Sequence, residues 1–493
     1  MNAGISSEDG LLLVLAVMLP AVGLVAMFVW PFRAPERAAF LLYVPGLAVA
    51  IAVLSKVMET AAPLTYVLGG WAPPLGTLLR ADGVAAMMLV VTALILGLVG
   101  LSAWPSFRTP AGERQTRRAF AFWALMLGLW SALNLAFLAR DLFTLFVALE
   151  LLTFAAVPLV ALEGKGETLA AALRYLLFAL AGSGLYLLGV ALIYSRYATL
   201  DIGTLADIAG GGDALALGLM TAGLMAKTAV FPLHLWLPPA HAAAPAPASA
   251  VLSALVVKAP FLIIVRLWFE LGGGPGPVGP ASVLLAGLGA ASILWCSVMA
   301  LRQSRLKLMI AYSTVAQIGY LFLMFPLADA AQPALTPGWT GGMLQLVSHA
   351  FAKAAMFVAA GLIAEALGHD RIDDLAGAAR AAPLSVAALA LAGLSLVGLP
   401  PSGGFNAKAI LLSAAVAQGQ WWIAIVILAG GVLAAGYVFR AIGRATGEPD
   451  AGLVLRPVSR WREAVPLALA LCALLLGFVP LRPLALFAIG AAP

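Results

Sequence analysis

Seven ionisable side chains stand inside or beside long apolar stretches of the 493-residue sequence. They are one glutamate, four lysines and two histidines: Glu150, Lys227, Lys258, Lys353, Lys408, His234 and His349. Burying a charge in hydrocarbon is unfavourable, so residues of this kind usually mark a route for ions or protons. His349 and Lys353 are four residues apart and share one face of a helix. The set therefore predicts a path for protons across a membrane.

Each of these residues also has a structural interpretation that requires no transport. Lys227 and Lys408 could extend from a helix end toward the membrane surface, as long basic side chains do. His234 could cap or pack at a helix break, and Glu150 could serve only as an ion-pair partner. Because only 10% of the chain is charged and five charges nevertheless fall at membrane depth, the transport path is the better interpretation.

The chemistry of such a path follows from pairing a buried amine with a carboxylate. A lysine withdrawn from water releases its proton more readily, and a nearby carboxylate makes the lysine retain it. We therefore expect Lys227 to keep its proton while Glu150 is close to it. We expect Lys227 to release the proton when the two side chains separate. The proton would then pass along the remaining positions, which are Lys258, His349, Lys353 and Lys408.

Membrane spans must position these residues, since 63% of the chain is hydrophobic and apolar runs recur throughout. The first run, from Leu11, lacks the basic start and cleavage site of a signal peptide, so we expect it to remain as a span. The sequence predicts an all-α integral membrane protein with about 14 spans. The predicted ranges are 11–30, 38–56, 83–103, 117–138, 142–161, 169–194, 213–231, 248–268, 281–300, 307–325, 341–364, 383–399 with a continuation to 418, 421–440 and 464–490.

The basic residues indicate how the spans are oriented. With the amino terminus outside, most of the 28 lysine and arginine residues fall in loops on the inner side, as the positive-inside rule requires. An even number of spans then puts both termini on the outside. The basic residues expected on the outer side are Lys56, Arg80, Arg140, Arg196, Arg266 and Arg482.

Two proline-containing segments are predicted to break helices. FPLHLWLPP, with Pro232, interrupts the seventh span, and VGLPPSGGFNAK, with Pro400 and Pro401, interrupts the twelfth. Broken helices at matching places in two halves are typical of transporters with inverted repeats, and the freed carbonyls admit water. The spacing of the breaks predicts five helices in each repeat. The expected division is a three-helix segment (1–116), a first repeat (117–270), a second repeat (281–443) and a last helix (444–493).

Other chemistry finds no support in the sequence. There is no P-loop, no dinucleotide fingerprint, no CxxC and no HExxH motif. Cys296 and Cys472 lie singly in apolar runs, where we expect them to pack. We predict no cofactor, no metal site and no nucleic-acid partner. The chain has no redox site of its own, which leaves its status as an enzyme open.

Five segments occur in an order that carries a family resemblance. They are DLFTLFVALELLTFAAVPLVALEG (141–164), LMAKTAVFPLHLWLPPAHAAAPAPASAVLSALVVKA (224–259), RLKLMIAYSTVAQIGY (305–320), SHAFAKAAMFVAAG (348–361) and GLPPSGGFNAK (398–408). Together they resemble the antiporter-like subunits shared by respiratory complex I, membrane-bound hydrogenases and Mrp-type sodium/proton antiporters. A further segment, LGGWAPPLGTLLRADGVAAMM (68–88), resembles the Mrp D and hydrogenase branch more than the complex I branch.

The resemblance implies fourteen helices, two inverted five-helix repeats and an axis of polar residues along the membrane midplane. It also implies other membrane subunits as partners within the lipid bilayer, in the inner membrane of a bacterium. Matched motif by motif, it implies relay roles for Glu150, Lys227, Lys258, His349, Lys353 and Lys408, with His234 following the first break.

The sequence departs from the family pattern at the start of the tenth span. Ser304 and Arg305 stand where the family commonly has an acidic residue, which puts an ion pair there in doubt. Glu150 is also the only carboxylate expected at the midplane. Since sodium sites need several oxygen ligands, proton conduction fits better than direct sodium binding.

Three functions are consistent with the resemblance. The first is a proton-translocating subunit of a multisubunit antiporter that exchanges H⁺ for a monovalent cation, with Na⁺ expected. The second is the same module driven by a hydrogenase-like or complex I-like redox complex. The third is a membrane scaffold that docks a soluble partner in a carbon-uptake system, against which the four midplane lysines argue.

Overall fold

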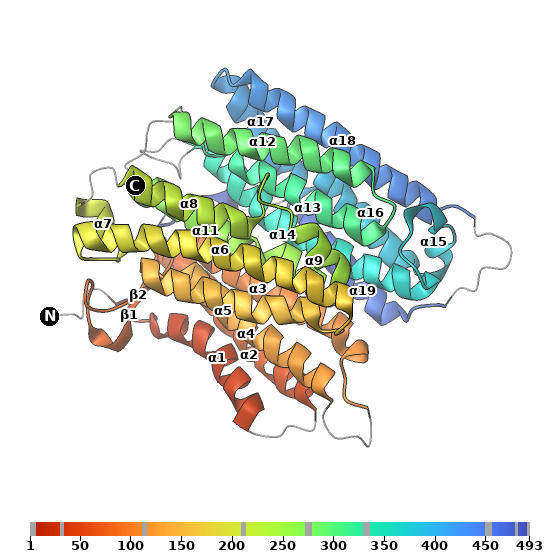
Figure 1. The fold of residues 1–493 in the computed structure, drawn as a ribbon, viewed down its shortest axis with the longest axis horizontal. Coiled ribbons are helices and arrows are strands. Elements are labelled where there is room, and N and C mark those ends of the chain that lie inside the picture. The colour runs from red at the N-terminus through yellow and green to blue at the C-terminus, as the bar shows by residue number, and fades with distance from the viewer. Residues whose placement is uncertain are drawn as a thin grey trace.

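The computed structural model describes residues 6–29, 34–110, 116–208, 213–271, 279–328, 336–448, 456–478 and 482–490. Within these residues the fold is almost entirely helical, and most helices lie side by side in one bundle (Figure 1). Ten helical stretches in this part of the chain are long and apolar enough to cross a membrane. The expected all-α membrane fold is therefore confirmed.

The ten stretches correspond to predicted spans. They are α1 (Leu11–Val29), α2 (Pro35–Thr60), α3 (Gly83–Ala103) with the turn η2 (Trp104–Ser106), α4 (Arg117–Leu138), α5 (Leu142–Ala161), α6 (Gly166–Tyr197), the stretch from α10 (Ala246–Val251) to η4 (Leu267–Leu271), α12 (Pro280–Leu301), α14 (Pro337–Leu367) and α18 (Trp421–Ala445). The shorter apolar helices are α8 (Ala214–Thr228), α13 (Leu306–Phe322), α16 (Pro383–Val397) and α17 (Gly403–Ala417). The other described helices include α7 (Ile202–Ile208), α9 (Leu237–Ala243), α11 (Lys258–Arg266), α15 (Ala378–Ala381) and α19 (Arg460–Leu475).

Two of the long stretches lie at the centre of the bundle. The stretch from α10 to η4 and helix α14 are almost wholly surrounded by other helices, whereas α1, α2, α6 and α18 each leave one apolar side exposed. In a membrane those exposed sides meet lipid, and every backbone polar group is bonded inside its own helix. The two central stretches carry Lys258 and Lys353. The fold thus separates its buried charges from lipid.

Small residues allow α6 and α8 to approach closely. The carbonyl oxygen of Gly182 lies 2.2 Å from the position that a Cβ on Gly223 would take. Close approach through glycine is the usual means of packing helices in lipid, where no hydrophobic force drives them together. A Cβ on Gly182 would in turn lie 3.4 Å from the side chain of Lys227. This crossing therefore helps to fix the position of that lysine.

Both predicted helix breaks are present. Helix α8 ends at Thr228, and Ala229 then adopts a left-handed conformation with φ of 61°. The indole of Trp236 donates a 2.9 Å hydrogen bond to the Ala226 carbonyl in the last turn, which also accepts from the Ala229 amide. Helix α16 ends at Val397, and α17 begins at Gly403 after its N-cap, Ser402.

Other parts of the chain differ from the sequence prediction. The segment before α3 forms a hairpin of strands β1 (Leu64–Val67) and β2 (Leu78–Ala81), which was not predicted. The predicted span 464–490 is wrong as a single helix, because α19 ends at Leu475 and the turn η7 (Arg482–Ala488) follows separately. The eighth span is not a regular α-helix, since η3 (Leu252–Val256) and η4 are π-helical. Both ends of the described chain attach to the hairpin, through Ser7 and Gly490.

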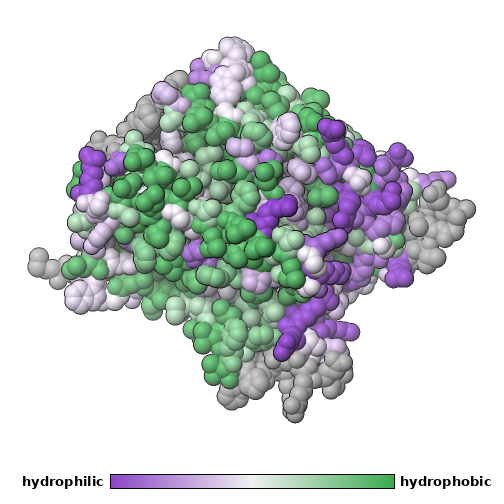
Figure 2. All heavy atoms as spheres, in the orientation of Figure 1, coloured by the Kyte–Doolittle hydropathy of each residue, from purple (hydrophilic) through white to green (hydrophobic). Residues whose placement is uncertain are grey.

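Hydrophilic residues gather at the end of the bundle that holds α15, and apolar residues cover much of the visible flank (Figure 2). Charged side chains at this end form ion pairs: Arg305–Asp370, Arg371–Asp374, Arg380–Glu448, Arg440–Asp373 and Arg462–Glu365. At the opposite end, Arg140 and Arg266 are buried, although the sequence indicated outer loops for both. The reason is that the hairpin and α7 cover this end of the bundle.

Candidate functional site

All four predicted relay lysines are buried. The exposed fraction is 7% for Lys227, 6% for Lys408 and 0% for both Lys258 and Lys353. None of the four extends to the bundle surface, so the structure contradicts the surface-seeking interpretation of Lys227 and Lys408. Each buried ammonium must therefore find its hydrogen-bond acceptors within the protein.

Lys227 and Glu150 form an ion pair between α8 and α5. The Nζ atom of Lys227 lies 3.2 Å from Oε1 of Glu150 and 2.9 Å from the hydroxyl oxygen of Thr153. The hydroxyl of Ser183, on α6, donates to the same carboxylate oxygen. Thr153 follows Glu150 by one turn of α5, so both partners of the lysine come from one helix face. The pair that the sequence predicted is brought together by three adjacent helices.

Lys258 is joined to α13 through Ser253. Its ammonium donates to the backbone carbonyl of Ser253, in the π-helical turn η3. The hydroxyl oxygen of Ser253 lies 2.8 Å from that of Thr314. The Thr314 hydroxyl in turn donates a 2.9 Å hydrogen bond to the carbonyl of Ile310. These groups extend polar contacts from the eighth span into α13.

Lys353 reaches the same carbonyl from the other side. Its Nζ atom lies 3.1 Å from the Ile310 carbonyl oxygen and also donates to the hydroxyl of Ser313. The Ile310 carbonyl therefore accepts hydrogen bonds from both Thr314 and Lys353. A continuous line of polar atoms connects Lys258 with Lys353.

Lys408 binds the end of α16. Its ammonium donates to the Leu396 carbonyl, lies 3.4 Å from the Val397 carbonyl oxygen, and stands 4.1 Å from the centre of the Tyr320 ring. The amide of Gln317 donates a 3.0 Å hydrogen bond to the same Leu396 carbonyl. Lys408 is thereby linked to α13 as well.

The central helix α14 contributes further polar residues beside Lys353. Gln345, His349 and Lys353 follow one another at four-residue intervals and share one face of the helix. The Gln345 amide donates a 3.1 Å hydrogen bond to Gln317. Both ring nitrogens of His349 are buried without a hydrogen-bond partner among the described residues. His349 lies close enough to Lys258, Lys353 and Lys408 to interact with all three electrostatically.

The structure does not join Lys227 to Lys258 directly. A small cavity lies beside Lys227, and Thr153, Val256 and Pro260 are among the other residues that line it. Its wall is mostly apolar, so a transfer from Lys227 to Lys258 would need water that is held near Lys227 and Thr153.

His234 and the three prolines at the helix breaks lie apart from the four buried lysines. His234 is buried in the segment between α8 and α9 and stacks on Phe231. Pro232, Pro400 and Pro401 lie at the two helix breaks. Their positions are those that the sequence predicted, but no hydrogen bond joins them to the relay lysines within the described residues.

Several polar residues of the site were not predicted from the sequence. They are Thr153, Ser183, His241, Ser253, Ser313, Thr314, Gln317 and Gln345. Most are uncharged and do not stand out in an apolar helix. Gln345 could have been predicted, because it precedes His349 by one helical turn and shares its face of the helix. His241 is buried against Phe357 and interacts electrostatically with Lys258 and Lys353.

An ion pair does form at the start of α13, which is the tenth predicted span. Nε of Arg305 lies 3.0 Å from Oδ1 of Asp370. The partner, Asp370, comes from the loop after α14. An acid at position 304 is therefore not needed to bind this end of α13.

Comparison with known proteins agrees with this architecture. The family model described as NADH:quinone oxidoreductase/Mrp antiporter, TM matches residues 139–434. NADH-quinone oxidoreductase subunit N of Desulforudis audaxviator (strain MP104C) is 34% identical, over 87% of this chain and 86% of the relative. A Na⁺/H⁺ antiporter subunit of Alkalihalophilus pseudofirmus (strain OF4) is 31% identical, over 74% and 72% of the two chains.

A solved structure extends the similarity to the whole fold. A chain of the membrane-bound sulfane sulfur reductase, an archaeal respiratory membrane complex, superposes with a TM-score of 0.87 at 28% identity, and 96% of each chain is covered. The family match, over residues 139–434, spans both broken helices and all four buried lysines. The chain therefore belongs to the NADH:quinone oxidoreductase/Mrp antiporter family of membrane subunits.

Proposed function

We propose that this chain is the proton-translocating subunit of a multisubunit membrane complex in a bacterial inner membrane. The observation that carries the proposal is the ion pair of Lys227 and Glu150, together with the polar line from Lys258 to Lys353. The complexes in which its relatives occur support the presence of other membrane subunits beside it.

The proposed mechanism begins at the ion pair. While Glu150 stays beside Lys227, its charge keeps the proton on the lysine. When Glu150 moves away or is neutralised, Lys227 releases the proton to water in the adjoining cavity, and Lys258 receives it. The proton then moves along hydroxyl, carbonyl and water positions to Lys353 and His349, and from there to Lys408.

The same proposal includes fourteen spans in two inverted five-helix repeats, with both termini outside. The breaks after α8 and α16 support the repeats, because each has a buried lysine close to it. The arginines at the end of the bundle that holds α15, among them Arg305, Arg371, Arg380 and Arg440, support an inner location for that end.

For the driving force we propose exchange against Na⁺, as the name of the Alkalihalophilus relative indicates. Glu150 is the one carboxylate in the described relay, so the chain itself offers few ligands for a sodium ion. We expect the chain to move the proton and a partner subunit to bind Na⁺.

A redox-driven pump is the second candidate. The match to a quinone oxidoreductase subunit is longer and slightly closer than the match to the antiporter subunit, at 34% against 31% identity. In that case electron transfer in partner subunits would move Glu150, and the relay would be unchanged.

Transport in vesicles tests the proposal. The whole gene cluster is expressed in an antiporter-deficient bacterial strain, and a pH-sensitive dye reports the response to Na⁺ or to an electron donor. We expect Lys227→Ala and Glu150→Ala each to abolish coupled transport at normal expression. Unchanged transport in either variant would refute the relay. A response to the electron donor alone would identify the redox-driven pump.

A further inference from the structure

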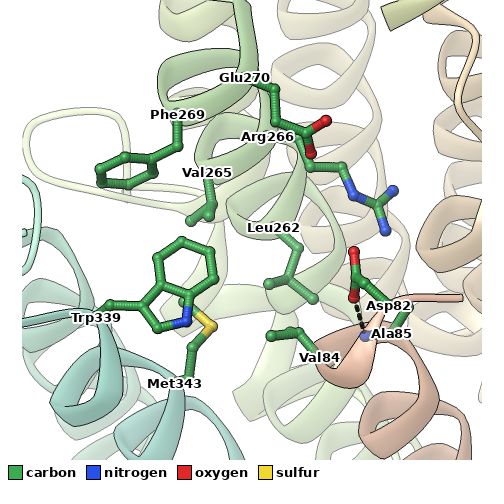
Figure 3. A pocket seen from close by; sticks show the side chains of 10 residues that line it. All are labelled: Asp82, Val84, Ala85, Leu262, Val265, Arg266, Phe269, Glu270, Trp339 and Met343. Atoms are coloured by element: carbon green, nitrogen blue, oxygen red, sulfur yellow. Dashed lines mark hydrogen bonds between the residues drawn. The ribbon is translucent and has the colours of Figure 1, made fainter. Parts of the chain in front are cut away.

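A pocket opens at the end of the bundle that carries the β-hairpin, which is the end expected to face outside. It lies between the first turns of α3 and α14 and the end of the eighth span (Figure 3). Asp82, Arg266 and Glu270 are its ionisable residues. Its cavity volume of about 30 Å³ has room for roughly two water molecules. The relay proposed above does not use this pocket.

One face of the eighth span connects the pocket to the midplane. Lys258, Leu262, Arg266 and Glu270 follow at intervals of four residues. The rise from Lys258 to Arg266, the two ends of helix α11, is about 12 Å, which is somewhat less than half the thickness of a bilayer core. Leu262 lies one turn from Lys258 and lines the pocket on the side away from Glu270 (Figure 3). Along the helix, Leu262 is therefore the pocket-lining residue nearest to Lys258.

Two arginines are held rigidly at the polar end of the pocket. Arg140 makes a bidentate ion pair with Glu270, in which Nη1 lies 2.7 Å from Oε1. Arg266 donates to the carbonyls of Ala136, Phe137 and Ala139, at the end of α4. Both guanidinium groups are buried and held by these bonds, and Glu270 compensates the charge of Arg140. The polar end of the pocket therefore holds paired charges in fixed positions.

Asp82 differs from the other charged residues of the pocket. Its Oδ1 atom accepts a 2.7 Å hydrogen bond from the Ala85 amide and caps helix α3. Among the described residues, its second oxygen forms no hydrogen bond. In Figure 3 the carboxylate points toward the Arg266 guanidinium, and the two attract each other electrostatically. Asp82 therefore has an oxygen available to receive a proton at the polar end of the pocket.

We propose that this pocket is the outer opening of the proton path and that Asp82 exchanges protons between Lys258 and outside water. The proposal rests on the proton-relay function above. One N–H bond of the Lys258 ammonium breaks, and its proton passes through water to the free oxygen of Asp82, which forms one O–H bond. The acid then gives that proton to outside water, and neutral Lys258 accepts the next one from Lys353 through the polar line. In the reverse direction the same bonds load Lys258 from outside water, and the proton passes on to Lys353 and Lys408 as proposed above.

Leu262, with Met343 beside it, is the gate in this path. An apolar constriction blocks proton flow when it is dry and permits flow when water enters. Because both side chains line the pocket, a polar group at position 262 should keep the constriction wet.

The first experiment replaces Asp82 in the complete complex and measures transport in vesicles. Asn is as good an N-cap as Asp, so Asp82→Asn preserves the start of α3 but cannot carry a proton. We expect transport to fall at least about tenfold, and Asp82→Glu to retain a larger share of the activity. Full activity of Asp82→Asn would overturn the proposal, since a purely structural role predicts that result.

The second experiment measures passive proton leak after an imposed pH jump, with no sodium or electron donor. We expect Leu262→Ser to raise the leak several-fold. Ile264→Ser is the control, because Ile264 is also buried on the same helix but does not line the pocket. Equal leak in the two variants would overturn the proposed gate.

Lys227→Ala in the same vesicles separates the two proposals. If it abolishes transport while Asp82→Asn does not, the outer opening is wrong and the relay stands. If Lys227→Ala is active, the relay itself fails, and the leak of Leu262→Ser still tests the pocket.

Discussion

Lys227 and Ser183 donate to the same oxygen atom, Oε1 of Glu150. The lysine lies on α8 and the serine on α6, so the carboxylate is bound from two helices at once. A carboxylate that keeps one hydrogen bond when the other breaks is less costly to separate from its lysine. Ser183 thus gives Glu150 a bonding partner that does not depend on the proton of Lys227.

Ser183→Ala should slow coupled transport. Without the serine hydroxyl, Glu150 depends more on the lysine, which then holds its proton more tightly. We expect a two- to fivefold lower rate at unchanged expression, on the order of 0.5–1 kcal/mol for one lost hydrogen bond. Dye-based transport in vesicles measures the rate. Ser195→Ala, at the exposed end of the same helix, is the control, and an equal loss in both variants would contradict this role.

Gln317→Leu should interrupt the path between Lys353 and Lys408. Gln317 bonds both Gln345 and the carbonyl that holds Lys408. We expect at least about a tenfold loss of transport, because the remaining polar groups of the path are separated by an apolar side chain. Gln303→Leu, just past the end of α12, removes a glutamine outside the path and should retain activity. A normal rate in Gln317→Leu would show that protons bypass this residue.

His241→Phe should reduce transport although an aromatic ring is preserved. His241 stacks on Phe357 with ring centres 4.8 Å apart, and phenylalanine can keep that contact. The substitution removes the two nitrogens that could carry a proton near Lys258 and Lys353. We expect a loss of about tenfold or more, measured with the same dye. His369→Phe, in the loop after α14, is the matched control. If the two variants behave alike, His241 is a packing residue.

Gly223→Ala should destabilise the protein and disturb Lys227. Its new Cβ would meet the Gly182 carbonyl oxygen and the Tyr186 amide, so α6 and α8 must separate. We expect an apparent melting temperature several degrees lower in detergent, consistent with an overpacking cost of roughly 1–3 kcal/mol. Gly218→Ala, on the same helix with open space where its Cβ would lie, should not lower it. A loss of similar size in Gly218→Ala would exclude helix separation as the cause.

The helices were predictable because a chain in lipid must satisfy its backbone inside each apolar run. Glu150, Lys227, Lys258 and Lys353 were also predictable, since a charge stands out in such a run. Gln317 and Thr314 do not stand out in this way, because uncharged polar residues are common in membrane helices and only neighbouring helices reveal their partners.

The pocket at the hairpin end could not be predicted from the sequence. Arg140 and Arg266 stand at the ends of apolar runs, where a solvated loop is the ordinary expectation. Only the packing of the hairpin and α7 over these positions makes them buried. The strand Leu64–Val67 is four residues long, which is too short for a clear pattern of alternation.

The carboxyl ends of α16 and α8 help to stabilise buried positive charge. Lys408 binds the last carbonyls of that helix, and Lys227 stands in the last turn of α8. Aligned peptide dipoles leave a helix with a partial negative charge of about half a unit at its carboxyl end. Each break therefore supplies part of a counterion at membrane depth without adding an acidic residue. A relay with one carboxylate among its described residues can in this way keep several buried lysines.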